Sequence, residues 1–225
     1  MTRIAVIDYD MGNLHSVCKG LENAGATPQV IASPDLIHQA DAVILPGVGA
    51  FDPAMQHLQS QAWIEPIHQV IATGKPFLGI CLGLQILFDR SEEGKQPGLG
   101  VFSGTVRRFS SEPGLTIPHM GWNQLRYTQS DLMLWENLPP SPWAYFVHSY
   151  YVDPAESDIT AATITHGHQT VTAAVARRNV MAVQFHPEKS STAGLQILQN
   201  FVRWVESGAS NELSGAPTLV TIPSR

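Results

Sequence analysis

In the first ninety residues, short runs of apolar and often β-branched residues alternate with longer stretches whose apolar residues recur every three or four positions. The runs are typical of buried strands, and the longer stretches are typical of amphipathic helices. Asn13 stands directly before the first helical stretch and is a candidate N-cap. The alternation predicts a parallel, doubly wound sheet, which binds ligands beyond the carboxyl ends of its strands. We predict strands at residues 3–8, 28–32, 41–45 and 76–80, and helices at residues 14–24 and 53–72.

Beyond Phe88 the pattern changes to short β-rich segments separated by turns, which we interpret as antiparallel or mixed additions to the same sheet. A last amphipathic stretch, from Leu195 to Val205, predicts a final helix with Ser190 or Ser191 as its cap. The expected fold class is therefore α/β, with a doubly wound, mostly parallel central sheet flanked by helices and extended by antiparallel strands. The β-rich segments are residues 101–109, 117–125, 145–152, 159–165, 170–176 and 181–185.

The chain has 225 residues, enough for one large domain with a full core. We expect a single domain over residues 1–206. Residues 207–225 are rich in Ser, Gly, Pro and Thr without periodicity, and they predict a flexible C-terminal tail. A hydrophobic content of 44% with 14% charged residues excludes a disordered chain. The net charge of -6 and the pI near 5.8 argue against a nucleic-acid binder, and no apolar run is long enough to span a membrane.

The two cysteines of the chain have different surroundings in the sequence. There is no Asn-x-Ser/Thr glycosylation site, and so few cysteines fit a soluble, reducing, cytoplasmic setting. Cys18 lies on the apolar stripe of the first predicted helix and is assigned to the core. Cys81 instead ends a predicted strand, which makes it the cysteine to consider for chemistry.

Cys81 lies between two glycines, Gly79 and Gly83, where the strand at 76–80 runs into an apolar helical stretch. Gly-x-Cys-x-Gly at a strand-to-helix turn is the nucleophile-elbow pattern, in which the glycines let strand and helix approach closely. A thiol at a helix N-terminus is favoured as the thiolate. The alternative is a small buried core residue, because free cysteine is often buried.

A base for this cysteine is available in His186, which follows the predicted strand at 181–185. An imidazole in hydrogen-bond reach would take the thiol proton and keep the thiolate available. Glu188 would orient His186 and stabilise its charged form, and Pro187 partly fixes their relative direction. His-Pro-Glu alone is more typical of an exposed turn. Together with the elbow it predicts a Cys81, His186, Glu188 triad.

A glycine-rich loop at 47–49 ends the strand at 41–45 and could supply backbone amides to the same crevice. We interpret it as one half of an oxyanion hole, with the Leu82 amide as the other half. A plain turn is the alternative. A phosphate-binding loop is disfavoured because Lys75 is followed by Pro76. His166 and His168 could share one strand face and hold a metal, but no third ligand is suggested.

Three stretches, at 46–51, 79–85 and 184–188, resemble the class I (triad) glutamine amidotransferases. Within that class, residues 46–51, 118–123 and 145–151 resemble the glutaminase subunits of imidazole glycerol phosphate synthases of histidine biosynthesis. The resemblance covers roughly residues 3–206 and leaves the tail unaccounted for.

The resemblance implies that Cys81 attacks the side-chain amide of L-glutamine, giving a thioester and ammonia, and that His186 activates the water that releases glutamate. It implies Val48 and Leu82 as the oxyanion-binding amides. The partner would be a cyclase subunit, a (β/α)8 barrel forming a heterodimer with this chain and consuming the ammonia. No cofactor or metal is implied. The implied glutamine-binding residues are Gly47, Gly49, Gln85, Ser149 and Tyr150, and the implied partner-contact residues are Asn13, Trp122, Asn123, Tyr145 and Lys189.

Three other functions compete with this interpretation. An amidotransferase of GMP, anthranilate or pyridoxal phosphate synthesis is disfavoured by residues 118–123 and 145–151. A free-standing cysteine hydrolase acting on γ-glutamyl peptides would use the same triad, and a non-catalytic binding subunit would not need it. We also expect the oxyanion loop to be misaligned in the isolated chain and to become competent when the partner and its ligand bind.

Overall fold

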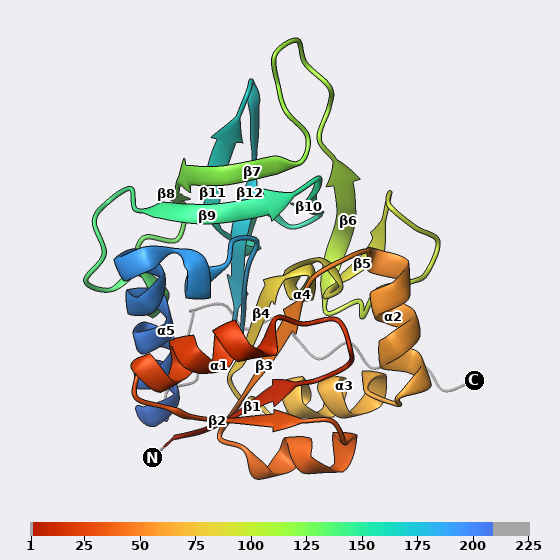
Figure 1. The fold of residues 1–225 in the computed structure, drawn as a ribbon, viewed down its shortest axis with the longest axis vertical. Coiled ribbons are helices and arrows are strands. Elements are labelled where there is room, and N and C mark those ends of the chain that lie inside the picture. Colours follow the sequence, from red (N-terminus) through yellow and green to blue (C-terminus); the bar gives the residue numbers. More distant parts are fainter. Residues whose placement is uncertain (1, 209–225) are drawn as a thin grey trace.

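The computed structural model describes residues 2–208 and places the predicted parallel sheet at its centre (Figure 1). Within these residues, eleven strands form one sheet, in the order β2-β1-β3-β4-β13-β12-β10-β6-β5, with β11 pairing β12 and β8. The parallel strands of its central part are β1 (Arg3–Ile7), β2 (Thr27–Ile31), β3 (Ala42–Gly47), β4 (Phe77–Cys81) and β13 (Val180–Val183). The predicted fold class is confirmed.

Side chains of the parallel strands alternate between two hydrophobic cores, one on each face of the sheet. In β3, for example, Ala42 and Ile44 belong to one core and Val43 and Leu45 to the other. Strands buried on both faces read as continuous apolar runs, which explains why they were recognisable in the sequence. Both faces of these strands are therefore apolar, and polar side chains and loops lie at the strand ends, where the sheet meets solvent.

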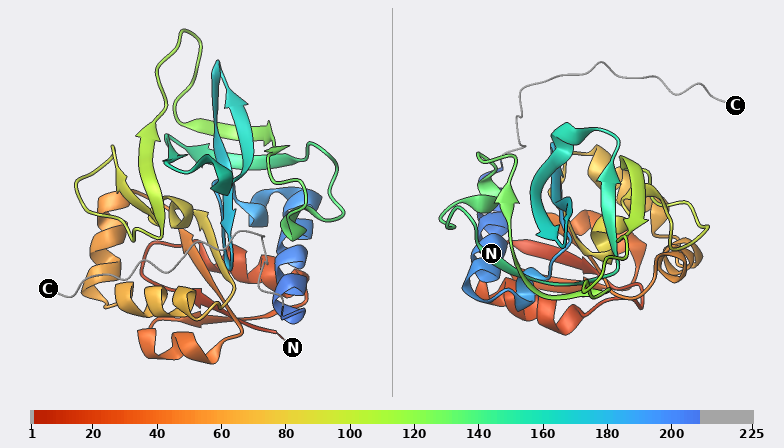
Figure 2. Two further views of the ribbon diagram at one scale, coloured as in Figure 1. Left: turned by 180° about the vertical axis from the view of Figure 1, so that it is seen from behind. Right: turned by 90° about the horizontal axis from the view of Figure 1, so that it is seen from above.

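Helices cover both faces of the parallel strands. The first core packs against α1 (Leu14–Asn23) and α5 (Ser191–Glu206), and the second packs against α2 (Phe51–Ser60) and α3 (Ile64–Ala72). Figures 1 and 2 show α1 and α5 together on one side and α2 and α3 on the other. Asn13 caps α1 as predicted, since its side chain accepts a hydrogen bond from the Ser16 amide.

The β-rich segments add antiparallel strands, but not all of them join the main sheet. β10 (Tyr150–Pro154) and β12 (Gln169–Arg177) extend the sheet as expected. β7 (His119–Gln124) and β9 (Trp143–His148) instead form a separate two-stranded sheet above the carboxyl ends of the parallel strands (Figure 1). The remaining elements are β5 (Phe88–Ser91), β6 (Phe102–Arg108), β8 (Arg126–Tyr127), β11 (Thr160–His166), and the 3-10 helices η1 (Pro34–Gln39), η2 (Met133–Trp135), η3 (Ser157–Ile159) and η4 (Pro187–Lys189).

The single helix predicted at 53–72 was wrong, because the chain breaks between α2 and α3. Ala62 has a positive φ of 59°, which ends α2, and the fully buried Trp63 then directs the chain into α3. Pro66 lies in the first turn of α3, where its missing N–H needs no helical partner. A continuous helix would have placed this proline in its interior.

Two further segment predictions need correction. The apolar helix expected after Cys81 is only α4 (Leu82–Gln85), because residues 99–102 take the carbonyls of Ile86 and Leu87 as hydrogen-bond acceptors. The single strand expected at 145–152 divides at Ser149 into β9 and β10.

The capping and tail predictions have mixed outcomes. Ser190 makes no capping hydrogen bond to α5, because its hydroxyl donates to the His186 carbonyl and accepts from the Tyr145 amide. Cys18 is half-buried against the core. The single domain over 1–206 stays a prediction. Of the predicted tail, residues 207 and 208 form a turn after α5, and the rest lie outside the described residues.

Candidate active site

Cys81 occupies a strained turn between β4 and α4. Its φ of 56° and ψ of −109° lie in a region that non-glycine residues rarely adopt, at a cost of about 1–3 kcal/mol. The residue is 6% exposed, so the thiol is largely buried at this turn. Because α4 has only four residues, its dipole contributes less to the thiolate than a long helix would.

The glycines around Cys81 are required by close backbone approach. A Cβ on Gly83 would lie 1.9 Å from the Leu45 carbonyl oxygen in β3, and one on Gly79 would lie 2.9 Å from the Gly83 carbonyl oxygen. Any larger residue at 83 would push α4 away from β3. This packing fixes Cys81 beside Gly47, its partner in the parallel register of β3 and β4.

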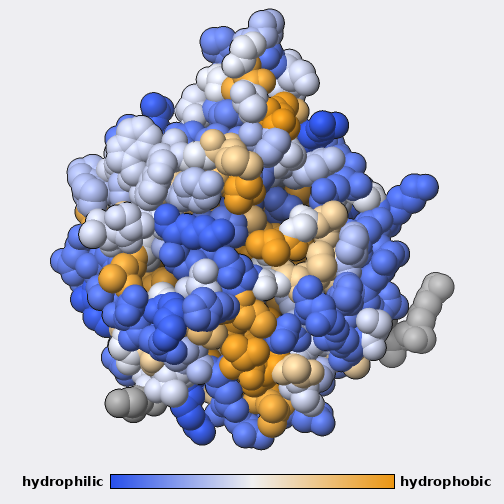
Figure 3. Space-filling view, in the orientation of Figure 1, coloured by the Kyte–Doolittle hydropathy of each residue, from blue (hydrophilic) through white to orange (hydrophobic). Residues whose placement is uncertain are grey.

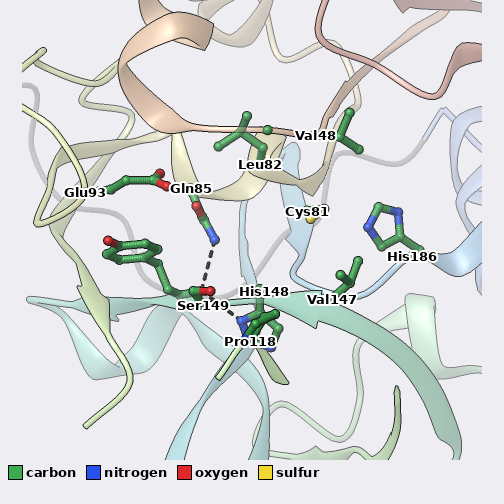
Figure 4. A pocket seen from close by; sticks show the side chains of 12 residues that line it. Val48, Cys81, Leu82, Gln85, Glu93, Pro118, Val147, His148, Ser149 and His186 are labelled. Atoms are coloured by element: carbon green, nitrogen blue, oxygen red, sulfur yellow. Dashed lines mark hydrogen bonds between the residues drawn. The ribbon is translucent and has the colours of Figure 1, made fainter. Parts of the chain in front are cut away.

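His186 and Glu188 form a buried pair at the end of β13. His186 Nδ1 lies 2.8 Å from Glu188 Oε1, and the two side chains are 3% and 1% exposed. Burial lowers the pKa of His186, but the Cys81 sulfur and Glu188 outweigh burial and raise this pKa to about 10. The imidazole is thus favoured in its charged form at neutral pH. Its Nε2 faces Cys81 in Figure 4 without a hydrogen-bond partner of normal geometry among the described residues.

Cys81 and His186 line one pocket of about 310 Å³ at the carboxyl ends of β3 and β4. Figure 4 shows the sulfur in the middle, His186 on one side and Gln85 on the other. Gly47 and Glu188 do not line the pocket: Gly47 pairs with Cys81 inside the sheet, and Glu188 stands behind His186. The other sequence-predicted residues that line it are Val48, Gly49, Leu82, Ser149 and Tyr150.

The loop after β3 is not arranged as an oxyanion hole. The Val48 amide donates to the Met11 carbonyl at 2.7 Å, so this N–H is already occupied. Gly49 has a φ of +100°, and a Cβ there would meet only the flexible end of Met11 at 2.9 Å. Turning the Val48 amide toward Cys81 requires breaking one hydrogen bond and rotating a peptide next to a glycine.

Gln85 is held in the pocket wall by two acceptors. Its Nε2 donates to the Tyr150 carbonyl and to Gln184 Oε1, both at 3.0 Å. Gln184 is fully buried, and its Nε2 lies 3.8 Å from the Cys81 sulfur. The sequence motif at 184–188 included Gln184, but no pattern indicated a role for it.

Glu93 and His148 also line the pocket and were not predicted from the sequence. Glu93 is the acidic residue among the lining side chains, and its Oε2 accepts from the Phe51 amide at 2.9 Å. It belongs to a charged surface stretch after β5, which is why it does not stand out in the sequence. Figure 4 shows Glu93 on the Gln85 side, away from His186.

Three of the predicted partner-contact residues lie on the small sheet above the pocket. Trp122 in β7 stands opposite Tyr145 in β9, with ring centroids 5.9 Å apart and nearly perpendicular planes. Trp122 is 48% exposed, whereas Asn123 is half-buried and donates to the Thr165 carbonyl. Lys189 is exposed beside the triad. Figure 3 shows the face that carries β7 and β9, with a band of apolar side chains between polar margins.

Within residues 2–208, no three His, Cys, Asp or Glu side chains are grouped so that they could hold a metal ion. The His166 ring lies tilted at 36° against His119, with ring centroids 4.2 Å apart, and its Nε2 contacts the Thr116 carbonyl. The same part of the chain holds no helix with the length and apolar character needed to cross a bilayer.

Comparison with known proteins gives closely similar sequences over nearly the whole chain. The model of the family "Glutamine amidotransferase class-I" matches residues 5–204. A protein of Trichodesmium erythraeum named "Imidazole glycerol phosphate synthase subunit HisH" is 71% identical over 202 residues, 90% of this chain and 94% of the relative. A protein of the same name from Gloeothece citriformis is 69% identical over 205 residues, with 91% and 97% covered.

Solved structures with the same fold are much less similar in sequence. The structure of PurLQS from Thermotoga maritima superposes with a TM-score of 0.71 at 19% identity, covering 91% of this chain and 100% of that one. The glutaminase domain of Trypanosoma brucei CTPS with bound acivicin gives a TM-score of 0.61 at 17% identity, covering 92% and 94%. At this identity the likeness concerns the fold alone.

Proposed function

This chain belongs to the class I glutamine amidotransferase family, and we propose that Cys81, His186 and Glu188 perform its glutamine hydrolysis. It is the glutaminase subunit of an imidazole glycerol phosphate synthase in histidine biosynthesis, since relatives of that name are about 70% identical over most of the chain. The buried His186–Glu188 pair beside Cys81, in a pocket of a size for one small amino acid, supports the residue roles.

In the first half of the reaction, the Cys81 thiolate attacks the side-chain carbonyl carbon of glutamine. Charged His186 then gives its Nε2 proton to the leaving nitrogen, the C–N bond breaks, and ammonia leaves a γ-glutamyl thioester on Cys81. The unpartnered Nε2 is the nitrogen free for this transfer, because Nδ1 is bound to Glu188. Glu188 fixes the ring and stabilises its charge.

In the second half, the now neutral His186 takes a proton from water, and the resulting hydroxide attacks the thioester. Glutamate leaves, its carboxyl proton passes to solvent, and the thiolate and charged imidazole are restored. The tetrahedral intermediates carry an oxyanion, for which the Leu82 amide and a reoriented Val48 amide are the donors. Glu93 provides a negative charge for the α-ammonium group of glutamine at the Gln85 end of the pocket, and the backbone at 149–150 contacts the α-carboxylate end.

The subunit works with a partner, which we propose to be a (β/α)8-barrel cyclase docked on the face of β7 and β9. Ammonia released into water would be protonated and diluted, so the acceptor must lie close to Cys81. Exposed Trp122 above the pocket supports this position, because tryptophan is enriched at interfaces. A cytoplasmic location is proposed with the same biosynthetic role.

The occupied Val48 amide supports low activity of the isolated subunit. One lost oxyanion donor lowers kcat by about 10²–10³ in comparable sites. We expect glutamine turnover by the isolated chain to rise by about that factor when the cyclase and its ligand are added, and to vanish in Cys81→Ala under both conditions. Full turnover without cyclase would favour a free-standing hydrolase and would exclude activation by the partner.

A further inference from the structure

A chain of hydrogen bonds links the Cys81 sulfur to the wall of the glutamine pocket. Gln184 Nε2 lies 3.8 Å from the sulfur, and Gln184 Oε1 accepts from Gln85 Nε2 at 3.0 Å. The second N–H of Gln85 goes to the Tyr150 carbonyl at 3.0 Å. Both acceptors are oxygens, so the amide of Gln85 has one orientation. Gln184 uses its oxygen on Gln85, and its Nε2 is the atom that faces the sulfur.

The Tyr150 carbonyl is also held from the opposite side. His148 Nδ1 donates to it at 2.8 Å, and His148 Nε2 then accepts from His119 Nδ1 at 3.2 Å. His119 Nε2 lies 3.4 Å from the Asn123 side-chain nitrogen on β7. Burial lowers the pKa of both histidines, to about 3 for His148 and about 4 for His119, so both rings are neutral at pH 7. With neutral rings, each ring nitrogen has one role, and the donors all point from Asn123 toward Tyr150.

These groups are buried, so they depend on each other for hydrogen bonds and their orientations are fixed together. Gln184 is 0% exposed, and Gln85, His148 and His119 are 5–6% exposed. Gln184 does not line the pocket, so if its amide loses a partner no water from the pocket can replace it. A core position with no functional demand would be better served by an apolar residue than by Gln184.

We propose that Gln184 is a positioning residue for glutamine hydrolysis, which donates to the Cys81 sulfur, anchors Gln85, and is joined through the Tyr150 carbonyl to the His148–His119 pair. This inference rests on the proposed function of Cys81. The two contacts of Gln184 serve different properties. The donor side affects the reactivity of the sulfur, and the acceptor side affects the binding of glutamine.

The test uses the chain assembled with its cyclase partner and ligand. Gln184→Met keeps the length and removes both contacts; Gln169→Met, on the β11–β12 hairpin away from the pocket, is the matched control. Two rates are measured: steady-state glutamine hydrolysis, giving kcat and KM, and inactivation of Cys81 by iodoacetamide, which needs no glutamine site. For Gln184→Met we expect KM to rise about tenfold and iodoacetamide inactivation to slow about tenfold, since each lost contact leaves a buried polar group unpaired.

The histidine end is tested by two substitutions that do not touch the sulfur. His148→Leu removes the donor to Tyr150, and we expect about a tenfold higher KM. His148→Asn places an amide N–H near the Nδ1 position, and we expect it to bring KM back to within about threefold of wild type. A purely structural role for His148 would make the two variants equal in KM.

The outcomes separate the proposal from the function on which it rests. Gln184→Met with both rates within twofold of the control would overturn the role of Gln184, and equal KM values for His148→Leu and His148→Asn would overturn the link to the histidines. If Gln184→Met does not fold, the same two rates are measured with Gln184→Glu, which keeps an acceptor oxygen for Gln85 but removes the N–H donor to the sulfur. For this variant, inactivation by iodoacetamide as fast as in the control would overturn the role of Gln184. Wild-type assembly without glutamine hydrolysis would instead contradict the proposed function, while the iodoacetamide rates would still report on the contact between Gln184 and Cys81.

Discussion

Gly83→Ala tests whether the close packing of α4 on β3 sets the geometry of the site. The added Cβ would lie 1.9 Å from the Leu45 carbonyl oxygen, and real Cβ contacts are essentially never shorter than 3.0 Å. The difference, 3.0 − 1.9 = 1.1 Å, is the separation that backbone movement must supply. Overpacking of this kind costs about 1–3 kcal/mol, and the better helix propensity of alanine returns up to about 1 kcal/mol.

Two measurements follow from that displacement. At about 2–4 °C per kcal/mol for a domain of this size, we expect Tm to fall by several degrees. β3 leads directly into the oxyanion loop, so about 1 Å of misplacement relative to Cys81 should lower kcat of the assembled enzyme by about 10². Gly25→Ala is the control. Nothing lies within 4 Å of a Cβ added at this position, but the φ of +91° is strained for alanine. It should lower Tm without changing kcat.

The reasoning fails if Gly83→Ala keeps the wild-type kcat and Tm, because the backbone could then absorb the clash at no cost. It also fails if Gly25→Ala lowers kcat as much as Gly83→Ala, because the loss of activity would then follow from stability alone.

Three further predictions concern binding and pH. Glu93→Gln keeps an acceptor for the Phe51 amide but removes the negative charge. In steady-state assays we expect KM for glutamine to rise about 10- to 100-fold, with little change in Tm. An unchanged KM would exclude Glu93 from binding the α-ammonium group. Trp122→Ala should weaken cyclase binding by about 30-fold in calorimetry, whereas Val30→Ala, on the exposed β2 edge, should not. The pKa values of His119 and His148 are lowered in the folded chain, so below pH 6.5 the unfolded chain binds more protons than the folded chain does. The free energy of unfolding should therefore fall as the pH drops toward 4. Urea unfolding at pH 7 and pH 5 measures this change. Between these two pH values the free energy of unfolding should fall less in His119→Gln than in wild type, and an equal fall would refute the prediction.

The parallel half of the fold could be predicted from the sequence because burial on both faces leaves a direct trace. The strands that end at Gly47 and Cys81 are uninterrupted apolar runs, and the turn after each is marked by glycine. Val48, Cys81 and Leu82, all predicted at these strand ends, therefore line one pocket.

Features that depend on distant contacts could not be predicted. The short α4 follows from hydrogen bonds that residues 99–102 make to its end, and the division at Ser149 follows from two separate strand pairings. Glu93 lies in a stretch that resembles any charged surface loop, and Gln184 became notable only when its two contacts were visible. The bond between the Val48 amide and Met11 joins two loops that no local pattern connects.

The central claim is that Cys81 forms the covalent intermediate, and trapping that intermediate tests it most directly. The assembled enzyme is mixed with glutamine, quenched with acid within one turnover, digested and analysed by mass spectrometry. We predict a γ-glutamyl thioester on the peptide that contains Cys81, absent in Cys81→Ala and strongly reduced in His186→Ala. An unmodified Cys81 peptide during full turnover, or persistent glutamine hydrolysis by Cys81→Ala, would contradict the account.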